Sequence, residues 1–176
     1  MRFTRLPLAG VVLVAMEPHR DDRGHFARSF CEDEFAAAGL PTRWPQMNVS
    51  VNARAGTLRG MHFQRPPFEE PKLVRCARGA ILDVVIDLRP GSVTFRQHVS
   101  VPLDAGSGDA LYVPPGFAHG FQALRDDTEV LYMMGARFEP GAQDGVRWDD
   151  PAFAIAWPLP VSAISPRDAA YADFAS

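Results

Sequence analysis

The chain carries a histidine between two cations in the stretch TLRGMHFQRPPFEEPKLVRC, residues 57–76. Arg59 lies three residues before His62, and Lys72 lies ten residues after it, beyond a Pro-Pro turn. An imidazole can act as a general base near neutral pH, and a guanidinium or ammonium group can hold an anion. The stretch therefore allows two interpretations, a core histidine that happens to lie near two surface cations, or a base beside an anion site.

A second histidine, His119, lies in GDALYVPPGFAHGF, residues 108–121. The spacing of Gly108, Pro114, Gly116 and His119 resembles the second conserved motif of the cupin jelly rolls. We expect the Pro and Gly residues to form a tight hairpin that directs His119 into a barrel.

Metal-dependent cupins add an HxH pair and a glutamate from their first motif to that histidine. In this chain His62 is followed by Phe63 and Gln64 where a second ligand would stand. A catalytic metal site needs about three such ligands. We therefore expect no metal and no other cofactor, a base or ligand-binding role for His62, and a binding or structural role for His119.

Alternating apolar residues indicate the strands that must position these groups. We expect strands over residues 46–52, 80–88, 98–103, 110–114 and 128–134, and another in VVLVAM, residues 11–16. In 80–88, alternation divides the residues into two faces, one with Leu82, Val84, Ile86 and Leu88 and the other with Ile81, Asp83, Val85 and Asp87. A helix is expected over 29–40, with a capping box from Ser29 to Glu32 and a stop at Gly39, and a second short helix near 165–174.

The strand over 46–52 has an apolar face and an amide-rich face. Gln46, Asn48, Ser50 and Asn52 alternate with Met47, Val49 and Val51. Alternation alone favours an ordinary strand whose polar face is in solvent. The alternative is a barrel whose lumen is lined by amides that bind a polar ligand.

Composition sets the class of protein. The chain has 176 residues, 47% of them hydrophobic and 22% charged, and a net charge of −3. This predicts one domain over residues 1–176, of the all-β class, as a cupin-like jelly-roll barrel with one or two short helices. Mixed charges argue against nucleic acid or a membrane as a partner. Cys31 and Cys76 are expected to be free thiols, buried as small hydrophobes, in a cytoplasmic protein.

Eight stretches in order resemble the dTDP-4-dehydrorhamnose 3,5-epimerase family, over about residues 5–170. They are DDRGHF, QMNVS, TLRGMHFQ, KLVRCARG, DVVIDLRPGSVTF, YVPPGFAHGF, GVRWDDP and ISPRDA. The resemblance implies a cupin-like jelly roll, a homodimer, no metal and a nucleotide-sugar substrate. It implies epimerisation at C3 and C5 of a dTDP-linked 4-keto-6-deoxyhexose.

The resemblance also implies catalytic roles. His62 would be the base, Asp168 would hold its imidazole, Lys72 would stabilise negative charge on the C4 oxygen and Tyr132 would be the acid. Competing structural roles are a helix cap for Asp168, a core aromatic for Tyr132 and a surface lysine for Lys72.

The resemblance implies a set of substrate-binding residues as well. Arg23 and Arg59 would lie near the diphosphate, Gln46, Asn48 and Arg147 would line the site, and His119 would lie near the sugar and phosphate.

Five positions depart from the family pattern. They are Arg28 in place of an acid, Met47 in place of Asp, Val49 in place of His, Met133 in place of Lys, and Phe138 in place of an aromatic hydroxyl. We expect these to cluster in the binding pocket, where Phe138 keeps a stacking surface. The rival functions are a 3-epimerase or keto-isomerase on a related nucleotide-linked ketosugar, a noncatalytic nucleotide-sugar-binding cupin, and a metal-dependent cupin enzyme.

Overall fold

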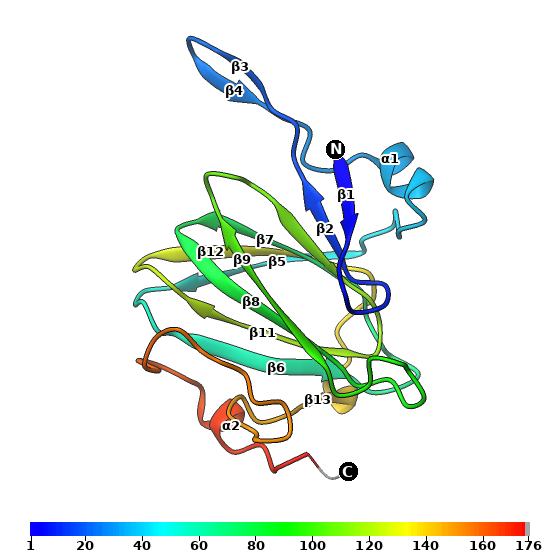
Figure 1. Cartoon of the computed structure of the whole chain (residues 1–176), viewed down its shortest axis with the longest axis vertical. Helices are drawn as coiled ribbons and strands as arrows, with labels where there is room; N and C mark the ends of the chain where they lie inside the picture. Colours follow the sequence, from blue (N-terminus) through cyan, green and yellow to red (C-terminus); the bar gives the residue numbers. More distant parts are fainter. Residues whose placement is uncertain (175–176) are drawn as a thin grey trace.

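Two antiparallel sheets face each other in the computed structural model, which describes residues 1–174 (Figure 1). The six-stranded sheet has the order β1 (Arg2–Arg5), β2 (Val12–Ala15), β10 (Ala110–Val113), β7 (Lys72–Arg78), β12 (Thr128–Met134) and β5 (Gln46–Asn52). The five-stranded sheet has the order β13 (Gln143–Gly145), β6 (Leu58–Gln64), β11 (Phe117–Ala123), β8 (Ala80–Asp87) and β9 (His98–Asp104). The prediction of an all-β, cupin-like jelly roll with two short helices is confirmed.

The core lies between the two sheets because their strands alternate side chains across the two faces. Val74 and Val130 from the six-stranded sheet meet Ile81, Val85 and Phe121 from the five-stranded sheet in one buried cluster. The other face of β8 packs Val84 and Ile86 under the C-terminal segment. Both faces of β8 are therefore buried, with the division of residues that alternation predicts.

The polar face of β5 points into the space between the sheets, so the favoured interpretation of this strand is wrong. Asn48 and Ser50 line an internal pocket and Asn52 is buried. Met47 is 62% exposed, and Val49 and Val51 are each 59% exposed. The reversal arises because β5 is the last strand of its sheet, and its outer face has no covering element in the described chain.

Helix α1 (Glu32–Ala37) is shorter than predicted and lacks the capping box. Cys31 is its N-cap and makes no side-chain hydrogen bond to the helix. The predicted stop is correct, because Gly39 has φ +72 and its N–H donates to the Ala36 carbonyl. Burial of Phe35, worth about 1.5–3 kcal/mol, holds this helix against the outer face of the six-stranded sheet.

Helix α2 (Pro166–Ala169) confirms the second predicted helix. Ser165 is its N-cap and accepts a hydrogen bond from the Asp168 N–H at 3.0 Å. None of the helices in residues 1–174 is long and apolar enough to span a bilayer.

The Pro114–Gly116 turn is not the predicted hairpin. It follows β10 in one sheet and leads into β11 in the other, so it carries the chain across the core. The strand that follows still directs His119 inward, because β11 pairs with β6 and β8 in a register that aligns His119 with His62.

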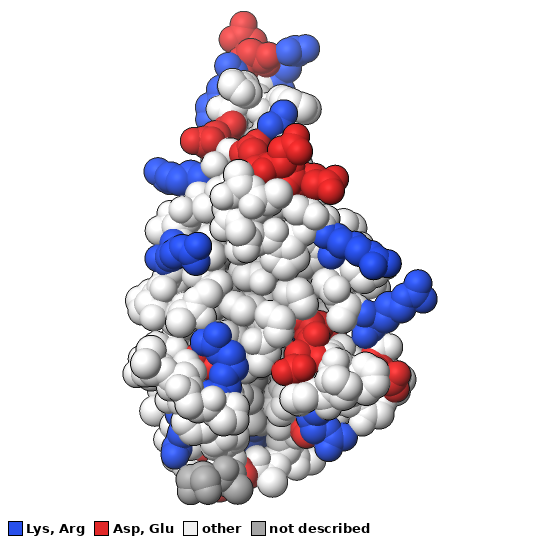
Figure 2. Space-filling model, turned by 90° about the vertical axis from the view of Figure 1, so that its right-hand side faces the viewer, with Lys and Arg blue, Asp and Glu red and all other residues white. Residues whose placement is uncertain are grey.

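A hairpin of β3 (His19–Asp21) and β4 (Gly24–Phe26) projects away from the two sheets (Figure 1). All six residues of its strands are exposed, and Phe26 is 78% exposed. Figure 2 shows it as a narrow arm that carries both acidic and basic side chains. A two-stranded hairpin is only marginally stable in water unless it packs against other elements. This exposed arm has little such packing within the described residues.

Candidate active site

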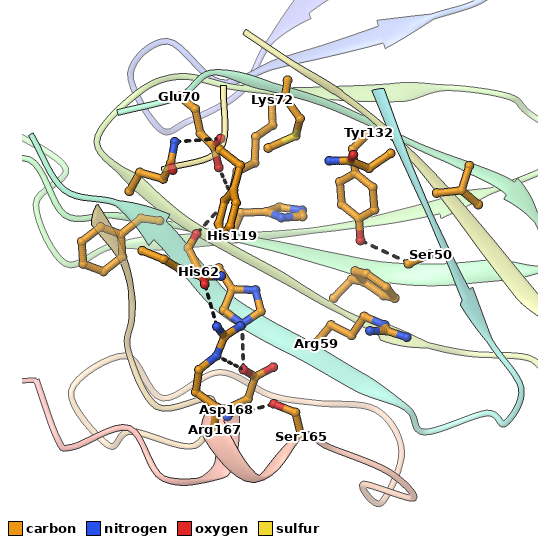
Figure 3. A pocket seen from close by; sticks show the side chains of 18 residues that line it. Ser50, Arg59, His62, Glu70, Lys72, His119, Tyr132, Ser165, Arg167 and Asp168 are labelled. Atoms are coloured by element: carbon orange, nitrogen blue, oxygen red, sulfur yellow. Dashed lines mark hydrogen bonds and ion pairs between the residues drawn. The ribbon is translucent and has the colours of Figure 1, made fainter. Parts of the chain in front are cut away.

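A cavity of about 330 Å³ opens between the two sheets, with polar groups from both (Figure 3). Its size suits a small organic ligand. Eight of the residues predicted for the site line this cavity: His62, Asp168, Tyr132, Lys72, Arg59, Asn48, His119 and Phe138.

His62 and Asp168 are far apart in sequence and form a hydrogen-bonded pair. Nε2 of His62 lies 2.8 Å from Oδ1 of Asp168. The carboxylate is 4% exposed, while the imidazole is 26% exposed and faces the cavity. Burial acts to raise the pKa of Asp168, but hydrogen bonds from His62, Gly60 and Ser165 outweigh it and hold the pKa below its ordinary value. Because Ser165 caps α2, the carboxylate of Asp168 is free to orient the imidazole.

A bulge in β6 turns His62 and Arg59 toward the same cavity. His119 is opposite His62, and Phe121 is opposite Arg59, so three steps along β6 match two steps along β11. Without the extra residue, side chains three apart would face opposite ways. The N–H of Gly60, inside the bulge, donates to Oδ2 of Asp168 at 3.2 Å. The same carboxylate therefore stabilises the bulge and orients the imidazole of His62.

Lys72 begins β7 and is 6% exposed, so it is not the surface lysine of the competing interpretation. Its Nζ donates to the His62 carbonyl at 3.2 Å and lies 3.4 Å from Oε1 of Glu70. Burial lowers the pKa of Lys72 from its ordinary value, and the carboxylates of Glu70 and Asp83 oppose that change. An ammonium group in such a position could stabilise an oxyanion.

Tyr132 projects from β12 into the cavity, with its hydroxyl 3.5 Å from Oγ of Ser50. Its ring packs edge-on against His119 and also contacts Phe121. Burial raises the pKa of Tyr132 above its ordinary value. The phenol is therefore protonated at neutral pH and can donate a proton.

A second histidine–carboxylate pair lies beside the first. Nε2 of His119 is 2.5 Å from Oδ1 of Asp83, and both side chains are buried. Oδ2 of Asp83 has no hydrogen-bond partner in residues 1–174. The pair fixes the His119 ring at the cavity wall, where it can contact a ligand.

Three of the residues predicted to bind the substrate lie at the mouth of the cavity. Nε of Arg59 donates to Oδ1 of Asn52 at 2.8 Å, which fixes the guanidinium beside the opening. Gln46 does not line the cavity itself, but its side chain contacts Asn48 and accepts a hydrogen bond from the Phe138 N–H at 3.3 Å. Phe138 is 48% exposed and offers a stacking surface.

Two predicted binding residues are not brought to this cavity. Arg23 lies on the projecting arm, where its guanidinium is 90% exposed and pairs with Asp21. Arg147 pairs with Asp149 and Asp173, so it fastens the C-terminal segment to the barrel. It is not among the residues that line this cavity, so its substrate-binding role stays a prediction.

The prediction that the five departures cluster in the pocket is also wrong. Met47 and Met133 lie on the outer face of the six-stranded sheet, in a hollow of about 230 Å³. Arg28 pairs with Glu34 near the arm, at 2.7 Å. Val49 borders the cavity, although most of its side chain is exposed on the outer face, so Phe138 is the clearest pocket departure. Strand alternation separates these positions into two environments.

Sequence reasoning missed several pocket residues. Glu70, Gln143 and Arg167 line the cavity, and Asp83 is the buried partner of His119. Asp83 had a usable signal, because a carboxylate in an otherwise apolar strand needs a buried partner. Glu70 and Arg167 had no such signal in the sequence. Glu70 lies in a loop and Arg167 in a short helix, and only the fold brings them to the cavity.

No group of three or more His, Cys, Asp and Glu side chains in the part of the chain that the structure describes is arranged to hold a metal ion. The expectation of a metal-free site stays a prediction.

Comparison with known proteins places this pocket in a family. The family model described as dTDP-4-dehydrorhamnose 3,5-epimerase matches residues 5–176. A dTDP-4-dehydrorhamnose 3,5-epimerase from Sinorhizobium fredii is 43% identical, over 90% of this chain and 81% of the relative. A dTDP-4-dehydrorhamnose 3-epimerase from Streptomyces niveus is 40% identical, over 96% of this chain and 81% of the relative.

A solved structure is similar over the whole fold. The dTDP-4-dehydrorhamnose 3,5-epimerase of Bacillus anthracis, solved with TDP and PPi bound, superposes with a TM-score of 0.95 at 35% identity. The match covers 98% of this chain and 99% of that one. With the cavity, its histidine–aspartate pair and its buried lysine, these matches show that the chain belongs to the dTDP-4-dehydrorhamnose 3,5-epimerase family.

Proposed function

We propose that this chain is an isomerase that epimerises a dTDP-linked 4-keto-6-deoxyhexose at C3 and C5, without a metal. The observation that carries the proposal is the His62–Asp168 pair at 2.8 Å, in one cavity with Lys72 and Tyr132. A base, an oxyanion stabiliser and a protonated acid are what this chemistry requires.

The proposed reaction moves one proton at a time. Hydrogens on C3 and C5 are acidic because each carbon adjoins the C4 ketone, so removal of either gives an enolate. His62 takes the proton, and Asp168 stabilises the imidazolium that forms. The Lys72 ammonium stabilises the enolate oxygen. Tyr132 returns a proton to the opposite face of the carbon. Before the second carbon reacts, His62 releases its proton to solvent and Tyr132 is reprotonated from solvent.

The nucleotide is proposed to lie across the cavity mouth. Arg59 offers a guanidinium to the diphosphate, and Asn48 and Gln46 offer amides on the adjacent strand. Phe138 offers its ring for stacking on the base, and His119 contacts the sugar and phosphate from inside the cavity.

We further propose a homodimer in which the β3–β4 arm of each protomer reaches the partner's pocket. Arg23 is the reason, because the family resemblance gives it a diphosphate-binding role while the fold holds it on an arm away from its own cavity. The exposed apolar side chains of Met47, Val49 and Val51 supply a surface for such an interface. The free thiols of Cys31 and Cys76 suit the cytoplasm, where we place the enzyme.

A 3-epimerase is the second candidate, because a relative with that name is 40% identical to this chain. It would use the same base and enolate, and would return a proton only at C3.

Incubation with dTDP-4-keto-6-deoxyglucose in deuterium oxide, followed by NMR at C3 and C5, tests the proposal. We expect exchange at both carbons, and loss of exchange by orders of magnitude in His62→Asn while dTDP still binds. Exchange at C3 alone would identify the 3-epimerase. Binding with no exchange in the unmodified protein would leave a noncatalytic nucleotide-sugar-binding protein.

A further inference from the structure

Lys72 is the only lysine in the chain, since every other cationic side chain among the 18 Lys and Arg residues is an arginine. It is also among the most buried charged residues, at 6% exposure. A buried ammonium group tends to lose its proton, because burial disfavours the charged form. Arginine does not share this weakness, as its guanidinium stays charged. The charge on Lys72 therefore depends on what surrounds it.

Glu70 is the nearest negative group to that ammonium. Its Oε1 lies 3.4 Å from Nζ of Lys72, and the side chain is 8% exposed. Its Oε2 accepts a hydrogen bond from Nε2 of Gln64 at 3.0 Å. Gln64 is itself buried, and its amide also bonds the Phe68 and Glu139 backbones. The carboxylate is thus built into the cavity wall, with one oxygen fixed by Gln64. Its other oxygen is directed at Lys72 (Figure 3).

Other charged and titratable groups face Lys72 less directly. Asp83, on β8, acts in the same direction on the Lys72 pKa, but its ion pair within residues 1–174 is with His119, whereas that of Lys72 is with Glu70. His62, on β6, presents its backbone carbonyl to Nζ and pairs its ring with Asp168. Tyr132, on β12, is a neutral phenol. Glu70 is therefore the carboxylate that lies within ion-pair distance of the ammonium group.

We propose that Glu70 is a positioning residue that keeps Lys72 charged and directs its ammonium group toward the cavity. Two of the lysine's contacts, to Glu70 and to the His62 carbonyl, lie on the wall. These leave a further N–H for a ligand oxygen in the cavity. The inference rests on the proposed function, where this N–H stabilises the enolate oxygen.

The single lysine makes the test direct. Protein labelled with ¹³Cε-lysine gives one lysine side-chain signal, whose shift against pH reports the pKa of Lys72. In Glu70→Gln we expect that pKa to fall by about one unit or more, because the facing negative charge is lost while burial remains. Glu69→Gln is the matched control, since Glu69 is the adjacent residue and does not line the cavity. It should leave the titration unchanged.

The exchange assay supplies a second readout. In the pH profile of the exchange rate, the fall at high pH should move to lower pH in Glu70→Gln, by the same amount as the lysine titration. In Glu69→Gln it should not move. Glu70→Asp keeps the negative charge, so the pKa of Lys72 should be close to its value in the unmodified protein. If Glu70→Gln does not fold, Glu70→Asp should still show a smaller shift in the same direction, because its carboxylate is one methylene farther from Nζ.

A lysine titration in Glu70→Gln that coincides with that of the unmodified protein would overturn the proposal, as would an unshifted titration in Glu70→Asp if only that variant folds. The titration needs no substrate. If the unmodified protein shows no exchange but the titration shifts, the proposed function fails while the role of Glu70 in charging Lys72 stands.

Discussion

Asp168 has a structural contact in the fold and a second role in the proposed reaction. Its Oδ1 pairs with His62 and its Oδ2 accepts the N–H of Gly60 in the β6 bulge. We predict that Asp168→Asn lowers kcat/KM for exchange by about 10²–10⁴-fold, because the amide cannot stabilise the imidazolium as a carboxylate does. Steady-state kinetics with the purified variant measures this.

Ser165→Ala is the control for the Asp168 prediction. It removes the N-cap of α2, at about 1 kcal/mol, and keeps the carboxylate. Exchange in this variant should stay near that of the unmodified protein. Near-normal exchange in Asp168→Asn would instead leave the carboxylate with a structural role alone.

The two cysteines differ in exposure and should differ in reactivity. Cys76 is 1% exposed, and burial raises its pKa to about 11. Cys31 is only partly buried, so the expectation that both are buried holds for Cys76 alone. We predict that a thiol reagent at about pH 8 modifies one cysteine in the folded protein and both in denaturant, because the thiolate is the reactive form. Rapid modification of two thiols in the folded state would contradict this.

At the residue scale, the proposed catalytic residues were predicted through the family resemblance and not through their spacing. Nothing in the chain between His62 and Asp168, which are 106 positions apart, predicts that they meet. Glu70 was missed because a glutamate in a proline-flanked loop has the same local pattern whether it is in solvent or in a cavity. Arg23 and Arg147 carry suitable charges, but the partners of a surface arginine depend on tertiary structure.

The bulge in β6 is the element that creates the site. Gly60 has φ +129, and a Cβ at this position would lie 2.5 Å from the Cα of Gly120. We predict that Gly60→Ala destabilises the protein by several kcal/mol, because both backbone strands would have to move. Urea unfolding measures the loss of stability, and the exchange assay reports whether His62 is displaced.

Gly141→Ala is the matched control for the bulge, since the atom nearest to an added Cβ there is 3.6 Å away. It should change stability little. A Gly60→Ala variant as stable and active as Gly141→Ala would show that the close approach of β6 and β11 does not matter.

Alternation found the strands but could not say which face of β5 is inside. The ends of β5 and β12 match the prediction, because period-two patterns there are unbroken. The orientation of β5 was wrong because an apolar face is normally the buried one, whereas here the amides line a cavity. The β6 bulge was not predicted, since an extra residue in a strand leaves no periodic signal of its own.

At the scale of the whole molecule, the exposed features point to a second copy of the chain. The outer hollow of the six-stranded sheet includes Phe30, Met47, Leu131 and Met133, and Val51 continues the apolar surface along β5. We predict that light scattering gives a mass in solution of twice 19.3 kDa. A mass of one chain at micromolar concentration would remove the homodimer.

The crossing of the arm into the partner's pocket has a sharper test, because it puts residues of one site on two chains. In Arg23→Ala the pocket keeps His62 and loses the partner's arginine, while in His62→Asn the arm is intact and the base is gone. Each variant alone should be deficient in exchange.

After the two variants are mixed, dissociated and reassociated, half of the dimers contain one chain of each. Each of these dimers holds one complete site, so about a quarter of normal activity should return. If Arg23 served its own pocket, a mixed dimer would hold no complete site, and activity would stay at the sum of the two variants. The regained activity therefore distinguishes a shared site from two separate ones, and the position of Arg23 on an exposed arm favours the shared site.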